Sequence, residues 1–210
     1  MLFLGMINNL SKKLHTSYYL QNDVVSIAKD LIGKKIVSNI NEELTSGIIT
    51  ETEAYRGYDD KACHAHLGRF TDRTKIMYEP GGVAYVYLCY GIHHLFNIIT
   101  NSKDQADAIL IRAVEPIDGV EVMLRRRNKE KLDKTLTSGP GNFSKAFALS
   151  KSHYGANLTG DEVWIEENEE FRFRESEITT SKRIGIDYAD EDKDLPWRFY
   201  LTTSKFVSKR

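Results

Sequence analysis

The stretch VAYVYLCYGIHHLFNIIT, residues 83–100, constrains the fold more than any other part of the chain. Branched and aromatic side chains, which favour strands, flank the pair Tyr90-Gly91. This pattern predicts a β-hairpin that turns near Tyr90-Gly91. Pro80-Gly81-Gly82 breaks the chain just before this stretch, so the hairpin is expected to begin after residue 82.

The rest of the chain mixes short strands with a few helices, without a regular alternation of the two. Strands are expected at 34–40, 46–55, 107–116, 161–167, 170–176, 182–189 and 197–203. Helices are expected at 22–33, 119–132 and 142–149, the first capped by Asn22 and ended by Gly33. Residues 56–74 have little periodicity and are expected to form a long functional loop. These elements indicate an α+β fold around a mainly antiparallel sheet.

Length and composition indicate one folded domain. The chain has 210 residues, of which 41% are hydrophobic, and no Pro/Gly-rich linker divides it. We expect a flexible N-terminal arm over residues 1–17 and a single domain over 18–210. No signal peptide, membrane span or CxxC pair is apparent, which predicts a cytoplasmic protein, associated with the nucleoid if the source is bacterial. The net charge of −1 argues against a generic nucleic-acid binder.

The segment ITETEAY, residues 49–55, places acidic groups in a predicted strand. Side chains alternate between the faces of a strand, so Ile49, Glu51, Glu53 and Tyr55 are expected to share one face. One interpretation is a strand whose glutamates simply face water. However, Arg112 lies in the apolar run ILIRAV, and a buried arginine needs a charged partner. A glutamate of this strand is the obvious candidate.

Several side chains that could form a pocket lie on neighbouring predicted elements. They are Glu53 and Tyr55 on one strand, Tyr85, Tyr87 and Cys89 on the next, His93, Leu95 and Asn97 on the return strand, and His64 in the long loop. Taken singly, each tyrosine could equally be a core aromatic whose hydroxyl reaches water. Together they predict a concave site with an acidic group.

Two other kinds of site remain open from these residues. His64, His66 and His93 could ligate a metal with Glu53, as in a metal-dependent hydrolase, although their spacing matches no standard ligand pattern. Glu51 and Glu53 could form an acid/base pair of a carbohydrate hydrolase, although both would leave the strand from one face.

The chain also resembles a known family. The segments TETEAYRGYDDKACHAHLGRFTDRT, MYEPGGVAYVYLCYGIHHLFNI, ILIRAVEP, SGPGNFSKAFAL and RIGI…PWRFY resemble, in this order, the alkyladenine (3-methyladenine) DNA glycosylases. The match runs from about Tyr18 to the C-terminus. It implies a curved, partly open and barrel-like sheet with flanking helices and a protruding hairpin that intercalates into DNA. It further implies a monomer without cofactor or metal, whose partner is double-stranded DNA containing alkylated purines.

The resemblance also implies a role for each matched residue. Glu53 matches the general base that activates water, and Arg112 the arginine that orients it. Tyr55, His64 and Tyr87 match the walls that hold the extruded base, Asn97 the group that excludes guanine, and Tyr90 the wedge that enters the duplex. Arg69, Arg73 and Lys75 are expected to contact the DNA backbone. Thr74 departs from the family, which often has Asn there.

The implied reaction is hydrolysis of the N-glycosidic bond to leave an abasic site. No motif offers a lysine nucleophile, so we expect a monofunctional enzyme that does not cut the strand. Glu53→Gln is expected to abolish base release, whereas Glu51→Gln is expected to be nearly silent. The alternative within this resemblance is a damaged-DNA-binding module that keeps the hairpin and lacks catalysis.

Overall fold

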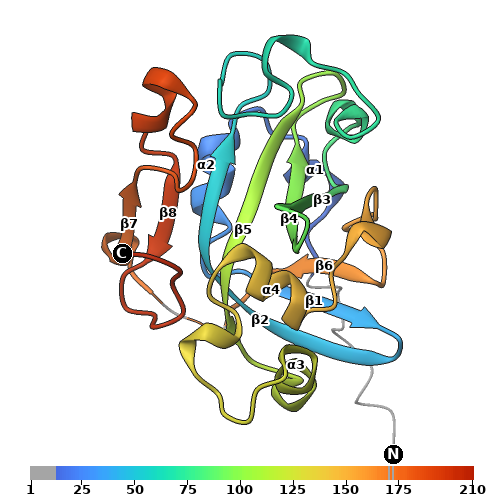
Figure 1. Ribbon diagram of the computed structural model, residues 1–210, viewed down its shortest axis with the longest axis vertical. Helices are drawn as coiled ribbons and strands as arrows, with labels where there is room; N and C mark the ends of the chain where they lie inside the picture. Colours follow the sequence, from blue (N-terminus) through green and yellow to red (C-terminus); the bar gives the residue numbers. More distant parts are fainter. Residues whose placement is uncertain (1–12, 170, 172) are drawn as a thin grey trace, which may run out of the picture.

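The computed structural model describes residues 13–169, 171 and 173–210, in which eight strands form one mainly antiparallel sheet (Figure 1). The strands are β1 (Lys35–Ile40), β2 (Glu43–Tyr55), β3 (Ala84–Cys89), β4 (His93–Thr100), β5 (Asp107–Pro116), β6 (Val163–Glu166), β7 (Ile178–Ser181) and β8 (Arg198–Leu201). The helices are α1 (Thr16–Tyr19), α2 (Val24–Asp30), α3 (Val120–Arg127) and α4 (Pro140–Ala146). Short 3-10 helices lie at His66–Gly68, Lys75–Tyr78, Lys134–Leu136, Lys151–His153, Glu175–Glu177 and Asp190–Asp194. The predicted α+β class and antiparallel sheet are confirmed.

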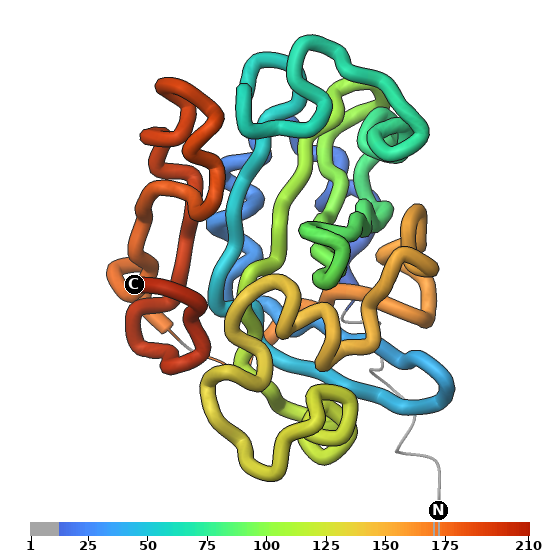
Figure 2. Tube along the Cα trace, in the orientation of Figure 1, coloured from blue at the N-terminus to red at the C-terminus, as the bar shows by residue number. Residues whose placement is uncertain are grey.

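Strand β2 is the spine of the sheet. It pairs with β5 along one edge, and with β1 and then β8 along the other. The sheet order is β3-β4-β5-β2-β1-β6, and β8 joins β2 to β7. The trace shows the C-terminal segment beside the upper half of β2, although about 150 residues separate them in the chain (Figure 2). The long central strand thus brings the hairpin and the C-terminus to opposite sides of Glu53.

A bulge in β2 changes which side chains share a face. The register with β5 shifts between Ile49 and Glu51 and again one residue later. Ile49 packs in the main hydrophobic cluster, whereas Glu51 and Glu53 both bind Arg112. The predicted shared face therefore holds for Glu51, Glu53 and Tyr55 but not for Ile49, because the extra residue breaks the alternation.

The helices cover the sheet unevenly. Helix α2 packs behind β2, where the hydroxyl of Thr52 donates to the carbonyl of Ala28 (2.7 Å). Helix α4 packs on β4 and β5, and its aromatic ring Phe143 meets Phe96 of β4. One hydrophobic cluster spans both helices and the strands between them. The hairpin and two loops, residues 56–74 and 182–189, cover the face of β2 that carries Glu53.

Three predicted helices differ from the structure at their ends. Asp23, not Asn22, caps α2, because its carboxylate accepts from the backbone of Val25 and Ser26. Helix α3 stops at Arg127, because Asn128 is left-handed and the backbone N–H of Lys129 then donates to the carbonyl of Leu124, a 6→1 hydrogen bond of the Schellman type. Helix α4 begins earlier than predicted because proline is well suited to the first helical position.

The C-terminal third contains fewer strands than the sequence pattern suggests. Residues 182–189 form a loop rather than a strand, and Gly185 there has a φ of +76°. The strand predicted at 170–176 is absent from its described residues, 171 and 173–176, while β7 (Ile178–Ser181) was not expected. The described residues include no helix long and apolar enough to span a membrane.

The first twelve residues of the expected arm lie outside the described part of the chain. Residues 13–17 belong to the fold. Lys13 bridges to Glu166 of β6, and Leu14 is buried and donates its backbone N–H to Ile165. These contacts attach residues 13 and 14 to β6.

Candidate active site

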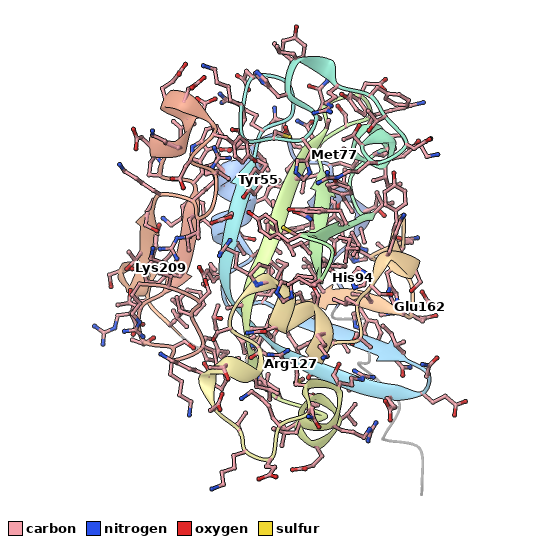
Figure 3. All side chains as sticks on the ribbon, viewed as in Figure 1. Tyr55, Met77, His94, Arg127, Glu162 and Lys209 are labelled. Carbon is pink, nitrogen blue, oxygen red and sulfur yellow. The ribbon has the colours of Figure 1, made fainter. Side chains whose placement is uncertain are left out.

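A cavity of about 540 Å³ opens on the face of the sheet that carries Tyr55. Its walls come from the end of β2, the loop after it, the hairpin, β5, the start of α4 and the loop 184–188. The lining includes seven of the residues to which the sequence analysis assigned a role: Tyr55, His64, Arg73, Tyr87, Tyr90, Asn97 and Arg112. Tyr55 and Met77 lie at the upper end of the sheet, with β5 between them in this view (Figure 3). Residues far apart in the chain thus meet at one hollow.

Glu53 lies just beneath this lining and is fully buried. Its Oε2 accepts from the hydroxyl of Tyr55 (2.7 Å) and from Nη1 of Arg112 (3.1 Å). Its Oε1 accepts from the backbone N–H of Ile184 (2.7 Å). These three donors fix the carboxylate and satisfy three of its roughly four acceptor positions. Among the described residues, no fourth donor reaches this carboxylate.

Arg112 has the glutamate partner that its apolar surroundings predicted. Its Nε lies 3.2 Å from Glu51, and its Nη1 contacts Glu53. Burial alone would lower the pKa of this guanidinium, but the carboxylates of Glu53 and Glu51 raise it above its usual value. Arg112 therefore stays charged and holds both glutamates in place.

Glu51 is as buried as Glu53 but faces a different set of groups. Its carboxylate accepts from Nη1 of Arg198 (2.7 Å) and from the backbone N–H and hydroxyl of Ser208 (2.6 and 2.8 Å). Glu51 does not line the cavity. It ties the C-terminal segment to β2 and supports Arg112 from behind.

One aromatic wall of the cavity is built around His64. The ring centroids of His64 and Tyr87 are 4.8 Å apart, and those of Tyr85 and Tyr87 are 5.3 Å apart. His64 Nδ1 is hydrogen-bonded to the hydroxyl of Tyr85 (2.9 Å). Burial and the neighbouring cations Arg73 and Arg69 lower the pKa of His64 to about 4. The imidazole is therefore neutral near pH 7.

Tyr55 also lines the cavity, and its ring lies beside a buried ion pair. The guanidinium of Arg183 lies 4.8 Å from the Tyr55 ring centroid and 5.1 Å from that of Trp197. Arg183 makes a bidentate contact with Asp60, and both side chains are fully buried. Arg183 also donates to the backbone carbonyl of Ala54 (2.9 Å). The pair joins the loop after β2, which carries Asp60, and the loop 182–189, which carries Arg183, to the end of β2.

Asn97 lines the cavity and is almost fully buried. Its Nδ2 donates to the carbonyl of Tyr85 (3.1 Å), on the neighbouring strand of the hairpin. This contact fixes the orientation of the side-chain amide. Asn97 therefore presents a fixed polar group to anything that fills the cavity.

Tyr90 lies at the tip of the hairpin, as the sequence predicted. Strands β3 and β4 pair up to Cys89 and His93, which leaves Tyr90, Gly91 and Ile92 to make the turn. Tyr90 is 89% exposed and Ile92 is 72% exposed. The ring of Tyr90 thus projects from the rim of the cavity into solvent.

All three residues expected to contact the DNA backbone are exposed, and Arg69 and Lys75 lie outside the cavity. Arg73 instead lines it. Its guanidinium lies 4.7 Å from the Tyr87 ring centroid and donates to the Tyr85 hydroxyl (3.1 Å). The structure thus groups Arg73 with the aromatic wall.

The comparisons with known proteins identify the family of this chain. Residues 18–205 match the family described as methylpurine-DNA glycosylase (MPG). Relatives named "Putative 3-methyladenine DNA glycosylase" include one from Alkaliphilus oremlandii, 44% identical over 205 residues, which cover 94% of this chain and 100% of the relative. Another, from Chlamydia felis, is 46% identical over 193 residues, which cover 91% of this chain and 97% of the relative. This chain belongs to the methylpurine-DNA glycosylase family.

The resemblance recognised in the sequence is therefore confirmed, and it bears on the two hydrolase alternatives. Within residues 13–169, 171 and 173–210, no three His, Cys, Asp or Glu side chains form a group that could hold a metal. His66 is bound to the carbonyl of Tyr58 (3.0 Å) rather than directed at His64. Glu51 and Glu53 are both committed to buried arginines. Neither alternative is favoured in this methylpurine-DNA glycosylase family member.

Reasoning from sequence missed Arg183, Asp60 and Ile184. Asp60 and Arg183 lie 123 residues apart, so no local pattern links them. One signal was available, since KRIGIDYA places an arginine among apolar residues, as ILIRAV does around Arg112. The same reasoning would have predicted a buried carboxylate partner for Arg183.

Proposed function

We propose that this protein is a DNA glycosylase that removes alkylated purines such as 3-methyladenine from duplex DNA. The family and the names of its relatives support this proposal. The single observation that carries the chemistry is the Glu53 carboxylate, buried and held by Arg112 and Tyr55 beneath an aromatic cavity. Such a site unites a place for a flat base with a group that can activate water.

The target base must leave the duplex before it can reach this cavity. Enzymes that act on a base, DNA glycosylases among them, rotate the nucleotide out at a cost of a few kcal/mol. Tyr90, at the exposed hairpin tip, would enter the gap and offset part of the lost stacking. Tyr90 lines the rim of the cavity, so the proposed wedge would lie beside the site where the extruded base would bind.

The aromatic walls would hold the extruded base. Stacking of a base on an aromatic side chain is worth about 1–3 kcal/mol, and Tyr55, His64 and Tyr87 all line the cavity. Asn97 would crowd the exocyclic amino group of guanine, because its amide lines the cavity in a fixed orientation. Shape and stacking would thus select a damaged purine without a base-specific hydrogen-bond code.

Glu53 would then activate water. Cleavage of the N-glycosidic bond builds positive charge on the sugar, as in glycoside hydrolysis. The Glu53 carboxylate would stabilise this charge and take a proton from water through its remaining acceptor position, while Arg112 and the N–H of Ile184 hold it. General-base catalysis of this kind is worth about 10²–10⁴-fold in rate.

The product would be an abasic site in an intact strand. Covalent catalysis with strand cleavage needs an amine at the sugar, and no lysine is among the described residues that line the cavity. Borohydride trapping should therefore yield no protein–DNA crosslink. A crosslink would refute water as the nucleophile.

One experiment tests the whole proposal. The purified protein is incubated with methylated duplex DNA, and the bases set free are identified. We expect 3-methyladenine to be released by the wild-type protein and not by Glu53→Gln, which should still bind the lesion. Release by both proteins would remove Glu53 from the mechanism, and release by neither would refute the glycosylase assignment.

A further inference from the structure

The charges around the cavity suggest how its preference between lesions is set, given the proposed function. Among the described residues that line it, the only arginines or lysines are Arg73 and Arg112, and none is a carboxylate. Many alkylated purines are cationic, whereas others are neutral. The charge that faces the base therefore matters for which lesion binds.

Most of the charge near the cavity is balanced by direct contacts. At the floor, Glu51 and Glu53 face Arg112 and Arg198. Behind Tyr55, the guanidinium of Arg183 is paired with Asp60.

Arg73 is the exception. Its recorded contacts are with the ring nitrogens of His64 (3.0 Å to Nε2), the hydroxyl of Tyr85 (3.1 Å) and the face of Tyr87 (4.7 Å to the centroid). Within the described part of the chain, no carboxylate pairs with it. Its nearest acidic neighbour in sequence, Asp72, lies 3.3 Å from Lys75 instead. The positive field of Arg73 is thus uncompensated at the aromatic wall.

A cation held against an aromatic ring uses the attraction that the ring offers to positive charge. A guanidinium over Tyr87 therefore reduces what that ring can give to a second cation stacked on it. A neutral purine loses little from this arrangement, and its nitrogen or oxygen acceptors could receive hydrogen bonds from the guanidinium. The two kinds of lesion are therefore affected unequally by one side chain.

We propose that Arg73 is a specificity-determining residue, which lowers the preference of the cavity for cationic purines relative to neutral ones. This role rests on the proposed function, and it differs from a contact with the DNA backbone. A backbone contact would change the binding of every lesion equally. Arg73 changes the ratio between a charged and an uncharged base of the same shape.

The test compares two duplexes that differ only in the charge of one base. One contains 3-methyladenine, which is cationic in DNA, and the other its uncharged isostere 3-methyl-3-deazaadenine. Dissociation constants for both are measured with the full-length protein carrying Glu53→Gln, so that the lesion is not consumed, with an undamaged duplex as the baseline. The measured quantity is the dissociation constant for the neutral duplex divided by that for the cationic duplex.

We expect Arg73→Gln to raise this ratio about threefold or more, on the scale of one cation–π contact. Arg73→Lys keeps the charge and should leave the ratio within about twofold of its parent. Lys75→Gln is the matched control, because it removes one exposed charge from the same segment outside the cavity. It should weaken binding of both duplexes equally and leave the ratio unchanged.

An unchanged or lower ratio in Arg73→Gln would overturn the proposal. So would binding of both lesions no tighter than that of undamaged DNA, because Arg73 would then be needed to build the cavity rather than to discriminate. Failure of the proposed function gives a different result, since the protein with Glu53 intact would then release no base from methylated DNA.

Discussion

His64 offers a titration that can be followed at a single residue. Burial and the cations Arg73 and Arg69 lower its pKa from 6.5 to about 4 in the folded chain. We expect an NMR titration of the ring, assigned with His64→Gln, to show a midpoint near pH 4. A midpoint near 6.5 would mean that the ring is neither buried nor held beside Arg73 in solution.

The same lowered pKa of His64 has a consequence for stability. Between pH 6.5 and about 4 the unfolded chain binds a proton at His64 that the folded chain does not. The free energy of unfolding therefore has its full His64 contribution above pH 6.5 and loses it as the pH falls through this range. Urea unfolding should show a shallower loss of stability on acidification for His64→Gln than for the wild type.

Replacing the two glutamates of β2 one at a time should distinguish an effect on stability from an effect on base release. From sequence alone, Glu51→Gln is expected to be nearly silent. Because Glu51 is fully buried against Arg112 and Arg198, we now expect its replacement to lower the free energy of unfolding by about 3 kcal/mol. Base release at saturating DNA should persist in the folded fraction.

Glu53→Gln provides the matched comparison. It also weakens a buried pair with Arg112, but it should lower base release by at least about 100-fold. Urea unfolding and base release are measured on both variants. An unchanged free energy of unfolding in Glu51→Gln, or unchanged base release in Glu53→Gln, would contradict the roles assigned to the two carboxylates.

At the residue scale, the sequence predicted those contacts that follow from the residues of a single strand. The need of Arg112 for a glutamate follows from its apolar neighbours alone. The burial of Glu51 could not be predicted, because its other partners, Arg198 and Ser208, are 147 and 157 residues away. A charge on a strand is ordinarily exposed, and only long-range pairing overturns that expectation.

Among the elements, the hairpin allows its wedge to be tested without loss of its turn. Tyr90 has a φ of 51°, a left-handed conformation that asparagine adopts more readily than most residues. Tyr90→Asn should therefore leave the melting temperature unchanged or raise it, while removing the ring. We expect base release from a well-paired duplex to fall about tenfold, with little change on single-stranded DNA.

Single-stranded DNA is the control for the Tyr90→Asn experiment, because no duplex has to be opened there. An equal loss on both substrates would show that Tyr90 contributes to the cavity rather than to extrusion. A lower melting temperature would show instead that the ring stabilises the hairpin, despite its exposure.

The loop 182–189 explains one error of sequence-based prediction. Ile184, Ile186 and Tyr188 all line the cavity, so alternate apolar residues share a face as in a strand. The positive φ of Gly185 and the lack of a ladder partner exclude a strand there. The periodicity was real, but it reflected a cavity wall rather than a sheet.

That loop is held by the Asp60–Arg183 pair, whose energetic coupling can be measured. Both side chains are fully buried, and their contact is bidentate. A lysine cannot reproduce a bidentate contact, so Arg183→Lys should lower the free energy of unfolding by about 2–3 kcal/mol. A double-mutant cycle with Asp60→Asn should give a coupling above about 1 kcal/mol.

The neighbouring pair Lys182–Asp194 is the matched control for Arg183→Lys. Its side chains are 67% and 57% exposed, so Lys182→Gln should change stability by less than about 1 kcal/mol. Equal effects of Lys182→Gln and Arg183→Lys would show that the buried pair does not hold the loop.

For the whole molecule, the sheet topology explains why the site needs most of the chain. Strand β2 carries both glutamates and is paired on one edge with β5 and on the other with β8. Arg112 comes from β5, while the C-terminal segment that binds Glu51 follows β8. Strand order and pairing of this kind depend on contacts across the full length, which a local sequence pattern does not contain.

The net charge of −1 leads to a last prediction about binding to DNA as a whole. With few surplus cations, few phosphates should be neutralised, and the affinity should depend on salt less steeply than for a basic DNA-binding domain. Arg69→Gln and Lys75→Gln should each reduce the slope of log K against log salt by about one. Lys29→Gln, on α2 behind the sheet and away from the cavity, should leave the slope unchanged. Binding to duplex DNA measured from low to moderate salt checks all three, and a slope that Lys29 alone reduces would place the DNA on the α2 side of the molecule.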